Sequence, residues 1–282
     1  MKIRNVGIVG QGFVGTALRK VFSCYNKIYT YDKVHKDLST HSSISDLSHS
    51  CDVVFVCVPT PMKPDGSCDT SIVEAVCLEA CNTGRQNIIV IKSTVPPGTT
   101  NKINDMCRSS QVVFNPEFLL ERNATEDFRN TTRVILGGPR PATTRLKQFY
   151  TNVFPKANII KTDATIAEFV KYLTNCFLAV KVSMANEIAG MCESAGVDYD
   201  KVIEYATQDA RLGDSHWSVP GPDGHFGFGG SCFPKDLNAL IQCAIDLGIS
   251  PNTLVGAWNT NLVVRPEKDW EELKGRAVIK EK

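Results

Sequence analysis

The chain has 282 residues, of which 43% are hydrophobic and 22% are charged, and its formal net charge at pH 7 is +1. This composition is ordinary for a globular protein of one or two domains. The near-neutral charge gives no reason to expect a nucleic acid or an acidic membrane as partner. No apolar run reaches the roughly 18 residues that a membrane span needs. The 11 cysteines form no CxxC pair, so we expect reduced thiols, a cytoplasmic location, no disulfide framework and no metal site.

The N-terminal stretch carries a glycine motif between a strand and a helix. The apolar run 6–9 is followed by Gly10-Gln11-Gly12-Phe13-Val14-Gly15, and a helical pattern continues from there. In this setting the first glycine makes the turn, the second lets the backbone approach a pyrophosphate, and the third allows close helix–strand packing. The helix N-terminus then offers amide donors to the phosphates. We therefore predict a dinucleotide site that includes Gly10, Gly12, Phe13, Val14 and Gly15.

A second strand, 27–31, ends at Asp32. A carboxylate in this position accepts hydrogen bonds from the ribose hydroxyls of NAD and repels the extra phosphate of NADP. Lys33 follows directly and weakens the exclusion of NADP. The motif and the acid together predict NAD as the cofactor.

Strand and helix patterns continue to alternate through the first half of the chain. Strands are predicted over 52–58, 87–92, 112–114 and 133–138, with a helix over 71–81. This alternation predicts a Rossmann-type, doubly wound parallel sheet over residues 1–162, with ligands at the carboxyl ends of the strands. Thr60, Thr94 and Glu117 all follow such ends, although turns and caps also favour these residue types.

The second half is predicted to be all-α. Residues 165–195 hold apolar side chains at helical spacing without a proline, and one helix of that length is long for a globular domain. We expect an all-α domain over 163–264 that faces a partner subunit, with further helices over 197–206, 235–247 and 251–262, and then a charged tail over 265–282. Lys171 and Asn175 share one face of the long helix. Their polar ends either meet a cleft or are simply solvated.

A glycine-rich approach leads to a single cysteine in Gly227-Phe228-Gly229-Gly230-Ser231-Cys232-Phe233-Pro234-Lys235-Asp236. A thiol at the start of a helix and near a cation is favoured as thiolate, which is the nucleophilic form. The alternative is a tight loop that holds a small buried cysteine. The glycines and the Lys-Asp pair favour a reactive Cys232.

These motifs together resemble the nucleotide-sugar dehydrogenases typified by UDP-glucose 6-dehydrogenase and GDP-mannose dehydrogenase. The resemblance extends from residue 3 to about residue 262, in the order of that family. Besides the glycine motif with Asp32 and the cysteine stretch, the matching segments are Val58-Pro59-Thr60-Pro61, Ser93-Thr94-Val95-Pro96-Pro97-Gly98-Thr99, Asn115-Pro116-Glu117-Phe118-Leu119, Lys171-Tyr172-Leu173-Thr174-Asn175 and 209–213.

The resemblance implies an NAD-dependent, four-electron oxidation of a sugar alcohol to a carboxylate, with UDP-glucose to UDP-glucuronate as the expected reaction. Cys232 would capture the aldehyde as a thiohemiacetal that is oxidised to a thioester. Lys171 and Asn175 would stabilise oxyanions on the reacting carbon. Asp236 and Glu117 would activate the hydrolytic water, which Thr94 would help to position.

The resemblance also implies the remaining contacts and the assembly. The expected cofactor contacts include Thr60, Thr94, Glu121 and Lys235. The expected substrate contacts are Glu117, Phe118, Leu119, Glu121, Lys171, Asn175, Arg211 and Gly229. We expect a homodimer through the helical domain, and the resemblance implies that Arg211 often reaches in from a neighbouring subunit. Members also continue into a second Rossmann-like domain that grips the nucleotide; this chain is therefore expected to be a short form without that domain.

Two other functions are compatible with parts of the pattern. The 3-hydroxyacid and 6-phosphogluconate dehydrogenases combine a Rossmann domain with a Lys-x-x-x-Asn helix, but they transfer two electrons and need no cysteine. A non-catalytic dinucleotide-binding subunit is the second alternative. The cysteine stretch argues against the first, and the presence of Cys232, Lys171, Asn175 and Glu117 together argues against the second.

Overall fold

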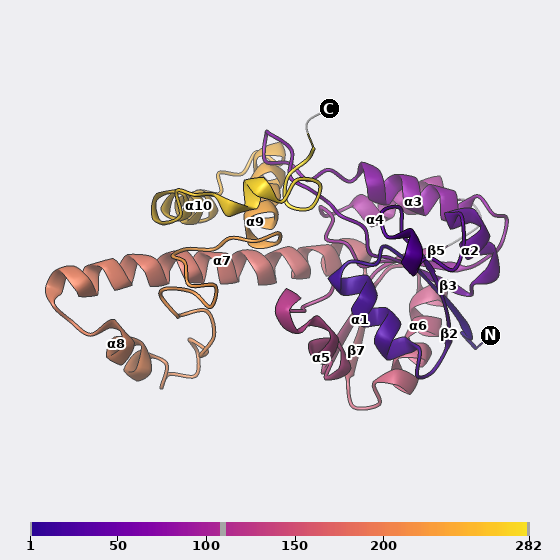
Figure 1. The fold of residues 1–282 in the computed structure, drawn as a ribbon, viewed down its shortest axis with the longest axis horizontal. Helices are drawn as coiled ribbons and strands as arrows, with labels where there is room; N and C mark the ends of the chain where they lie inside the picture. The colour runs from indigo at the N-terminus through magenta and orange to yellow at the C-terminus, as the bar shows by residue number, and fades with distance from the viewer. Residues whose placement is uncertain (1, 108–110, 281–282) are drawn as a thin grey trace. The chain divides into compact units, whose positions relative to one another are not determined.

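The computed structural model describes residues 2–107 and 111–280. The chain divides into two compact units, the first made of residues 1–60 and 70–171 and the second of residues 61–69 and 172–282 (Figure 1). The boundary between these units falls inside the long helix, and a short segment from the first half of the chain belongs to the second unit.

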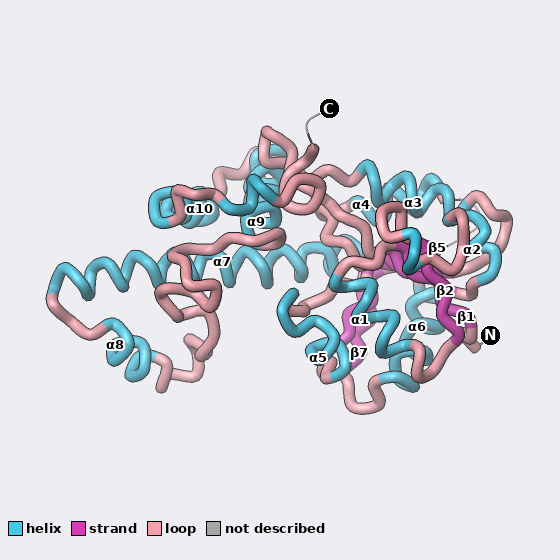
Figure 2. The backbone as a smooth tube through the Cα atoms, in the orientation of Figure 1, coloured by secondary structure: helices cyan, strands magenta, loops and turns pink. Residues whose placement is uncertain are grey.

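The first unit contains a seven-stranded sheet in the order β2-β1-β3-β4-β5-β6-β7. Figure 2 draws the strands in magenta among the helices of this unit. Neighbouring strands run parallel except for β5 and β6, which are antiparallel. The strands are β1 (Asn5–Val9), β2 (Lys27–Tyr31), β3 (Val53–Val56), β4 (Ile88–Ile91), β5 (Gln111–Phe114), β6 (Arg133–Gly137) and β7 (Asn158–Thr162). The doubly wound α/β prediction is therefore confirmed.

Helices cover both faces of this sheet. They are α1 (Phe13–Phe22), α2 (Ile44–Ser50), α3 (Ser71–Cys81), α4 (Thr99–Met106), α5 (Ala124–Arg129) and α6 (Arg140–Val153), with short 3-10 turns η1 (Lys36–Leu38) and η2 (Glu121–Asn123). Every residue of β3 and β4 is buried, as expected for strands covered on both faces. Side chains of α1, α5 and α6 form one core cluster with the sheet, and side chains of α2, α3 and α4 form the other.

The second unit is all-α apart from isolated bridges. Its helices are most of α7 (Ala164–Ala195), then α8 (Tyr199–Ala206), α9 (Phe233–Asp246), α10 (Asn252–Val264) and the 3-10 turn η3 (Asp269–Glu272). The single long helix predicted over 165–195 is confirmed. Tyr172, Phe228 and Leu237 belong to the core of this unit.

Residues predicted as a charged tail are folded into the second unit. The Trp270 side chain is only 1% exposed, and Arg265 is buried in ion pairs with Asp223 and Asp269. The backbone of Met62 pairs with Ala277 and Ile279, which ties the 61–69 segment to the end of the chain. This segment has no apolar periodicity because one buried tryptophan, rather than a helical stripe, packs it against the unit.

One disulfide corrects the expectation that all thiols are reduced. Cys81 and Cys107 are bonded, with their Cα atoms 5.7 Å apart, whereas the other nine cysteines are outside any disulfide. Cys81 ends α3 and Cys107 caps α4. The two helices pack side by side, a proximity that a sequence separation of 26 does not reveal.

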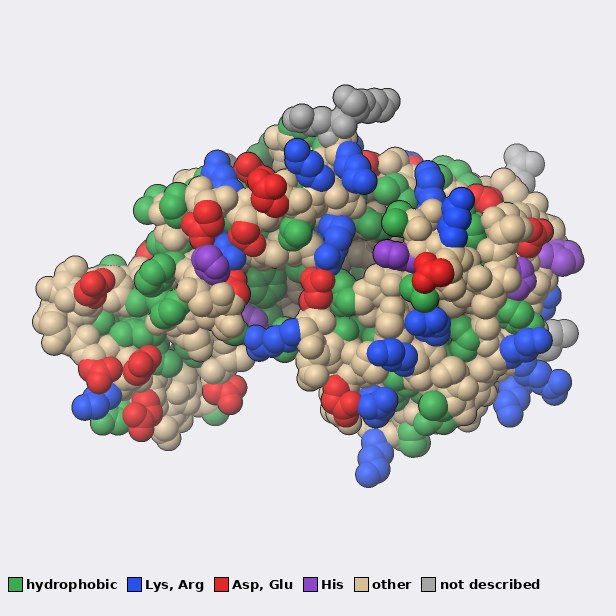
Figure 3. Space-filling model, in the orientation of Figure 1, with side chains coloured by type: hydrophobic (Ala, Val, Ile, Leu, Met, Phe, Trp, Pro, Cys, Tyr) green, Lys and Arg blue, Asp and Glu red, His purple; other side chains and the backbone are tan. Residues whose placement is uncertain are grey.

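Across the described ranges, no group of His, Cys, Asp and Glu side chains could hold a metal ion. No helix within the same ranges is long and apolar enough to cross a membrane. Basic and acidic side chains both occur over the visible face of the molecule (Figure 3), in keeping with the small net charge.

A buried carboxylate fixes the start of α7 to the start of α4 inside the first unit. The Glu168 side chain is fully buried. It accepts hydrogen bonds from the Gly98 backbone N–H at 2.6 Å, the Thr100 backbone N–H at 2.8 Å and the Thr100 hydroxyl at 2.6 Å. Burial raises the pKa of Glu168, and these three donors oppose that rise. The carboxylate supplies acceptors for backbone donors that the first turn of α4 cannot pair internally.

Replacing this carboxylate should destabilise the first unit. We expect Glu168→Ala to lower the free energy of unfolding by about 2–4 kcal/mol, because it leaves buried N–H groups without an acceptor. Urea denaturation measures the change. Glu126→Ala, which removes an exposed ion pair with Arg129, is the control and should change stability by less than about 1 kcal/mol. Equal effects of the two substitutions would contradict this account of α4.

Candidate functional site

Three glycines shape the turn between β1 and α1. Gly10 has φ of +91°, and a Cβ atom there would collide with the Cys57 carbonyl oxygen. A Cβ on Gly15 would collide with the Gly10 carbonyl oxygen. A Cβ on Gly12 would meet nothing within 4 Å. Packing therefore requires Gly10 and Gly15, whereas Gly12 leaves open space at the helix start, where a ligand can approach the backbone.

Asp32 lies directly after β2, at the same edge of the sheet as the glycine turn. Its carboxylate accepts hydrogen bonds from the backbone N–H groups of Gln11 at 2.6 Å, Val34 at 2.7 Å and His35 at 2.8 Å. Partial burial raises the pKa of Asp32, but the three backbone donors outweigh that effect and leave the pKa below its usual value. Asp32 is therefore ionised at neutral pH. Lys33, by contrast, is exposed.

A cavity of about 530 Å³ opens at the N-terminus of α1. Its wall combines the start of that helix with the η2–α5 segment, so the predicted cofactor residues Gly12, Phe13 and Glu121 lie around one cavity. The remaining lining residues are Gln11, Thr16 and 122–126. Open space above Gly12, a helix N-terminus and an ionised acid at the next strand end fit a dinucleotide. Here NAD would be held by the backbone of Gly12 and Phe13 and by Asp32.

A buried ion pair stands at the end of β5. The Lys171 ammonium lies 3.0 Å from Glu117 Oε1 and donates to the Glu117 carbonyl oxygen at 2.6 Å. The side chains are 4% and 8% exposed. Glu117 Oε2 also accepts from the Leu119 backbone N–H at 2.7 Å. Burial raises the pKa of Glu117, but Lys171 and the Leu119 N–H more than reverse it, so the pKa is lowered. Sequence spacing did not predict that Lys171 would pair with Glu117.

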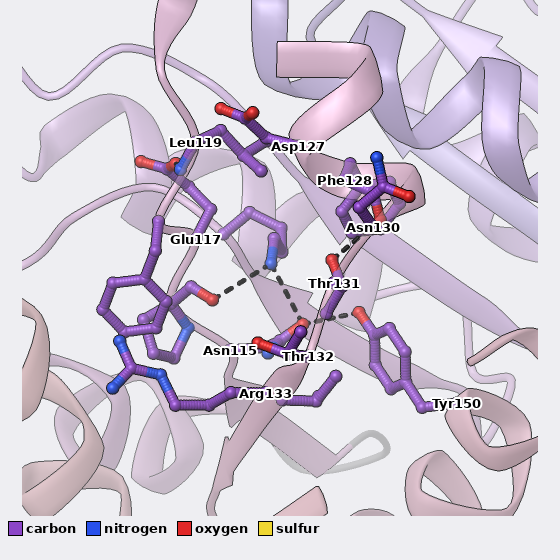
Figure 4. Close-up of a pocket in the computed structure, with 14 residues that line it drawn as sticks. Asn115, Glu117, Leu119, Asp127, Phe128, Asn130, Thr131, Thr132, Arg133 and Tyr150 are labelled. Atoms are coloured by element: carbon purple, nitrogen blue, oxygen red, sulfur yellow. Dashed lines mark hydrogen bonds between the residues drawn. The ribbon is translucent and has the colours of Figure 1, made fainter. Parts of the chain in front are cut away.

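The segment that carries Glu117 borders a second cavity, of about 340 Å³ (Figure 4). Glu117, Phe118 and Leu119 line it together with Lys92 and Arg133. The Arg133 guanidinium lies 4.2 Å from the centre of the Phe118 ring, and the Lys171 ammonium 5.4 Å from it. Thr60 and Thr94 are buried in the same unit. Lys92, at the end of β4, is a site residue that the sequence analysis missed.

The second unit carries the cysteine. Cys232 is the N-cap residue of α9 and lies 3.8 Å from the Ser231 hydroxyl, measured between sulfur and oxygen. Lys235 and Asp236 form an ion pair one turn further on. Asp236 is 1% exposed and accepts a hydrogen bond from the Asn175 amide at 2.6 Å. The predicted residues Asn175, Cys232, Lys235 and Asp236 thus form one cluster within this unit.

The charge of Lys235 couples this cluster to the thiol. Burial lowers the pKa of Lys235, but the charges of Asp236, Cys232 and Cys68 outweigh it and raise the pKa above its ordinary value. A cation fixed at the start of a helix is a setting that favours a thiolate over a thiol. The arrangement places the Cys232 sulfur near such a cation and near a buried carboxylate.

Two predicted substrate residues lie apart from this cluster. A Cβ on Gly229 would collide with Arg265 and Asp269, so packing within the second unit explains this glycine. The Arg211 side chain is 89% exposed and pairs with Asp209. Their predicted contacts with substrate stay predictions.

Fold and site together define a protein with a Rossmann-type dinucleotide-binding unit and a helical unit that carries a cysteine at the start of a helix. Residues 26–154 match the NAD-binding domain, and residues 165–262 the central domain, of the UDP-glucose/GDP-mannose dehydrogenase family. The chain belongs to that family, as the resemblance implied. The match to its NAD-binding domain confirms NAD as the predicted cofactor.

Individual relatives agree with this assignment. The chain is 38% identical to a UDP-glucose 6-dehydrogenase from Pseudomonas aeruginosa over 77% of its own length and 50% of that protein. A UDP-glucose dehydrogenase structure from Pyrobaculum islandicum matches with a TM-score of 0.82 and 29% identity, covering 93% of this chain and 68% of that one. The chain therefore spans about half the length of the curated relatives it matches.

A 3-hydroxyisobutyrate dehydrogenase shares the fold. The 3-hydroxyisobutyrate dehydrogenase of Mycobacterium tuberculosis matches with a TM-score of 0.75, covering 95% of both chains, at 16% identity. Identity this low shows a common fold and nothing about the reaction. The distinction between the two kinds of dehydrogenase therefore depends on the cysteine cluster.

The glycine turn gives a matched pair of substitutions. We expect Gly12→Ala to weaken NAD binding at least about tenfold with little change in stability, because its Cβ fills the space through which a pyrophosphate approaches the backbone. Gly15→Ala should instead lower stability, because its Cβ collides with the Gly10 carbonyl. Calorimetric titration with NAD and thermal unfolding measure the two effects. Wild-type NAD affinity in Gly12→Ala would show that the cofactor binds elsewhere.

Proposed function

We propose that the chain catalyses the NAD-dependent, four-electron oxidation of a nucleotide sugar, with UDP-glucose to UDP-glucuronate as the reaction. The observation that carries the proposal is the cluster of Cys232, Lys235, Asp236 and Asn175 in one unit of a chain that also has the family's NAD-binding unit. Relatives named UDP-glucose 6-dehydrogenase support the choice of sugar and nucleotide.

Two NAD molecules, bound in turn, would each accept one hydride. Between the two oxidations the Cys232 thiolate adds to the aldehyde carbon and forms a thiohemiacetal, which keeps the aldehyde from escaping. Loss of a hydride from that carbon and of the proton from its hydroxyl leaves a thioester on Cys232. Water then cleaves the carbon–sulfur bond, releasing the carboxylate and regenerating the thiolate.

Lys171 and Asn175 have more hydrogen-bond donors than their contacts with Glu117 and Asp236 use. Lys171 uses two of its three N–H donors on Glu117, and Asn175 uses one amide N–H on Asp236. The remaining donors are suited to an oxyanion on the reacting carbon. Asp236 and Glu117 are both buried carboxylates, each in an ion pair with a lysine. We propose Asp236 or Glu117 as the group that orients the hydrolytic water, with Thr94 helping to position it.

Cys232→Ser should abolish formation of the acid. We expect the rate of acid formation to fall at least about a thousandfold, since serine at neutral pH is a far weaker nucleophile than a thiolate. Cys243→Ser, in the same helix, is the matched control and should keep wild-type activity. Intact-protein mass spectrometry of Asp236→Asn with UDP-glucose and NAD should reveal a covalent adduct on Cys232.

A panel of UDP- and GDP-sugars tests the substrate. Turnover of UDP-glucose above the other sugars supports the proposal. Turnover with unchanged rates in Cys232→Ser would favour a two-electron dehydrogenase. NAD binding with no turnover of any panel member would favour a non-catalytic subunit.

We further propose a cytoplasmic homodimer formed through the helical unit. Apolar side chains on α7 are exposed in the single chain, with Leu173 at 68%, Phe177 at 61%, Met184 at 53% and Met191 at 61%. Their spacing of four, seven and seven residues puts them on one face of the helix. An exposed apolar stripe of this length is typical of a surface that another subunit covers.

A charge on this stripe should prevent dimer formation. We expect Phe177→Asp to shift the protein from dimer to monomer in sedimentation velocity runs, because an unpaired carboxylate would be buried in the interface. Lys201→Glu on α8 is the control and should leave the sedimentation coefficient unchanged. A monomeric wild-type protein at micromolar concentration would contradict the dimer.

A further inference from the structure

Lys92 is a buried lysine that the proposed chemistry leaves unused. It follows the all-apolar strand β4, and only 4% of it is exposed. Its ammonium donates to Asn115 Oδ1 at 3.1 Å and to the Pro116 carbonyl oxygen at 3.3 Å. Desolvation of a charge is costly unless its surroundings compensate for it. A methionine of similar size would fill this space without the desolvation cost. Packing alone therefore does not explain why a lysine is buried here.

The partners of Lys92 are the two residues that immediately precede Glu117. Asn115 is held from other sides as well, since its Oδ1 accepts from the Tyr150 hydroxyl at 2.5 Å and its amide donates to the Ile135 carbonyl at 2.7 Å. Figure 4 shows the Tyr150–Asn115 bond beside Glu117 at the cavity wall. The backbone that aims Glu117 is therefore fixed from β4, α6 and β6.

We propose that Lys92 is a positioning residue for Glu117. Lys92 holds the Asn115 side chain and the Pro116 carbonyl, and it supplies the Glu117 carboxylate with a buried positive charge in addition to that of Lys171. Lys92 and Glu117 line the same cavity of about 340 Å³. The catalytic consequence of this role rests on the function proposed above, whereas the effect of Lys92 on Glu117 does not.

The charges around Lys92 come from several elements. Burial lowers the pKa of Lys92 to about 8, and the positive charge of Lys171 acts in the same direction. Cys57 and the carboxylate of Glu117 act in the opposite direction. The Tyr150 hydroxyl, whose pKa burial raises, is neutral over the same pH range. The positive charge of Lys92 is thus present at neutral pH and is lost as the pH rises through about 8. Below that pH it helps to keep Glu117 ionised.

Carboxyl titration tests the proposal without any substrate. In protein labelled with ¹³C at glutamate carboxyls, the resonance that disappears in Glu117→Gln belongs to Glu117. We expect it to titrate at higher pH in Lys92→Met than in wild type, because a stabilising positive charge is gone. The matched control is Tyr150→Phe, which removes the neutral donor to the same Asn115 oxygen. It should leave the pH at which Glu117 titrates unchanged.

A reciprocal measurement covers the case in which Lys92→Met does not fold. The Lys92 Cε resonance of the folded Glu117→Gln protein should titrate at lower pH than in wild type, since its negative partner is removed. Unchanged titration of Lys92 in that protein, or of Glu117 in a folded Lys92→Met, would overturn the inference.

Kinetics separate this inference from the proposed function. With UDP-glucose and NAD we expect Lys92→Met to lower kcat about tenfold to a hundredfold with KM for NAD changed less than about twofold, and its acidic pH–rate limb to move to higher pH. Absence of turnover in the wild type would refute the proposed function, while the titrations would still decide the role of Lys92.

Discussion

The buried ion pair of Lys171 and Glu117 is the interaction on which the candidate chemistry of the first unit depends. Removing two charges from water costs several kcal/mol per ion, and this pair recovers the cost through a 3.0 Å contact and hydrogen bonds to backbone groups. A pair of apolar residues would be at least as stable. Its presence makes sense if a fixed cation and a fixed carboxylate are needed at the carboxyl edge of the sheet.

The second unit has a similar buried ion pair near its thiol. Asp236 is buried against Lys235 and Asn175, and Lys235 keeps its charge because Asp236, Cys232 and Cys68 outweigh its burial. In each unit a buried lysine forms an ion pair with a buried carboxylate. Such preorganised charges act on a developing oxyanion without reorganising during the reaction.

Sequence patterns predicted the sheet and the long helix well, because buried parallel strands such as β3 and β4 are apolar throughout and α7 has an unbroken helical period. They did not reveal the short helices α2, α4 and α5, which end within a few turns, or the edge strand β7, whose side chains are half exposed. The site residues could be recognised in the sequence, but their contacts with one another could not. Lys171 binds Glu117 from 54 positions away, and Lys92, after β4, binds Asn115, after the neighbouring strand β5. The Cys81–Cys107 disulfide was hidden for the same reason.

The central proposal is that Cys232 converts an ordinary two-electron dehydrogenase fold into a four-electron one. Its most direct test is the number of NADH molecules formed per molecule of UDP-glucose consumed, measured by absorbance against chromatographic loss of the sugar. The account predicts two NADH per sugar, with UDP-glucuronate as the product. One NADH per sugar, with a free aldehyde or ketone as the product and the same yield from Cys232→Ser, would contradict it.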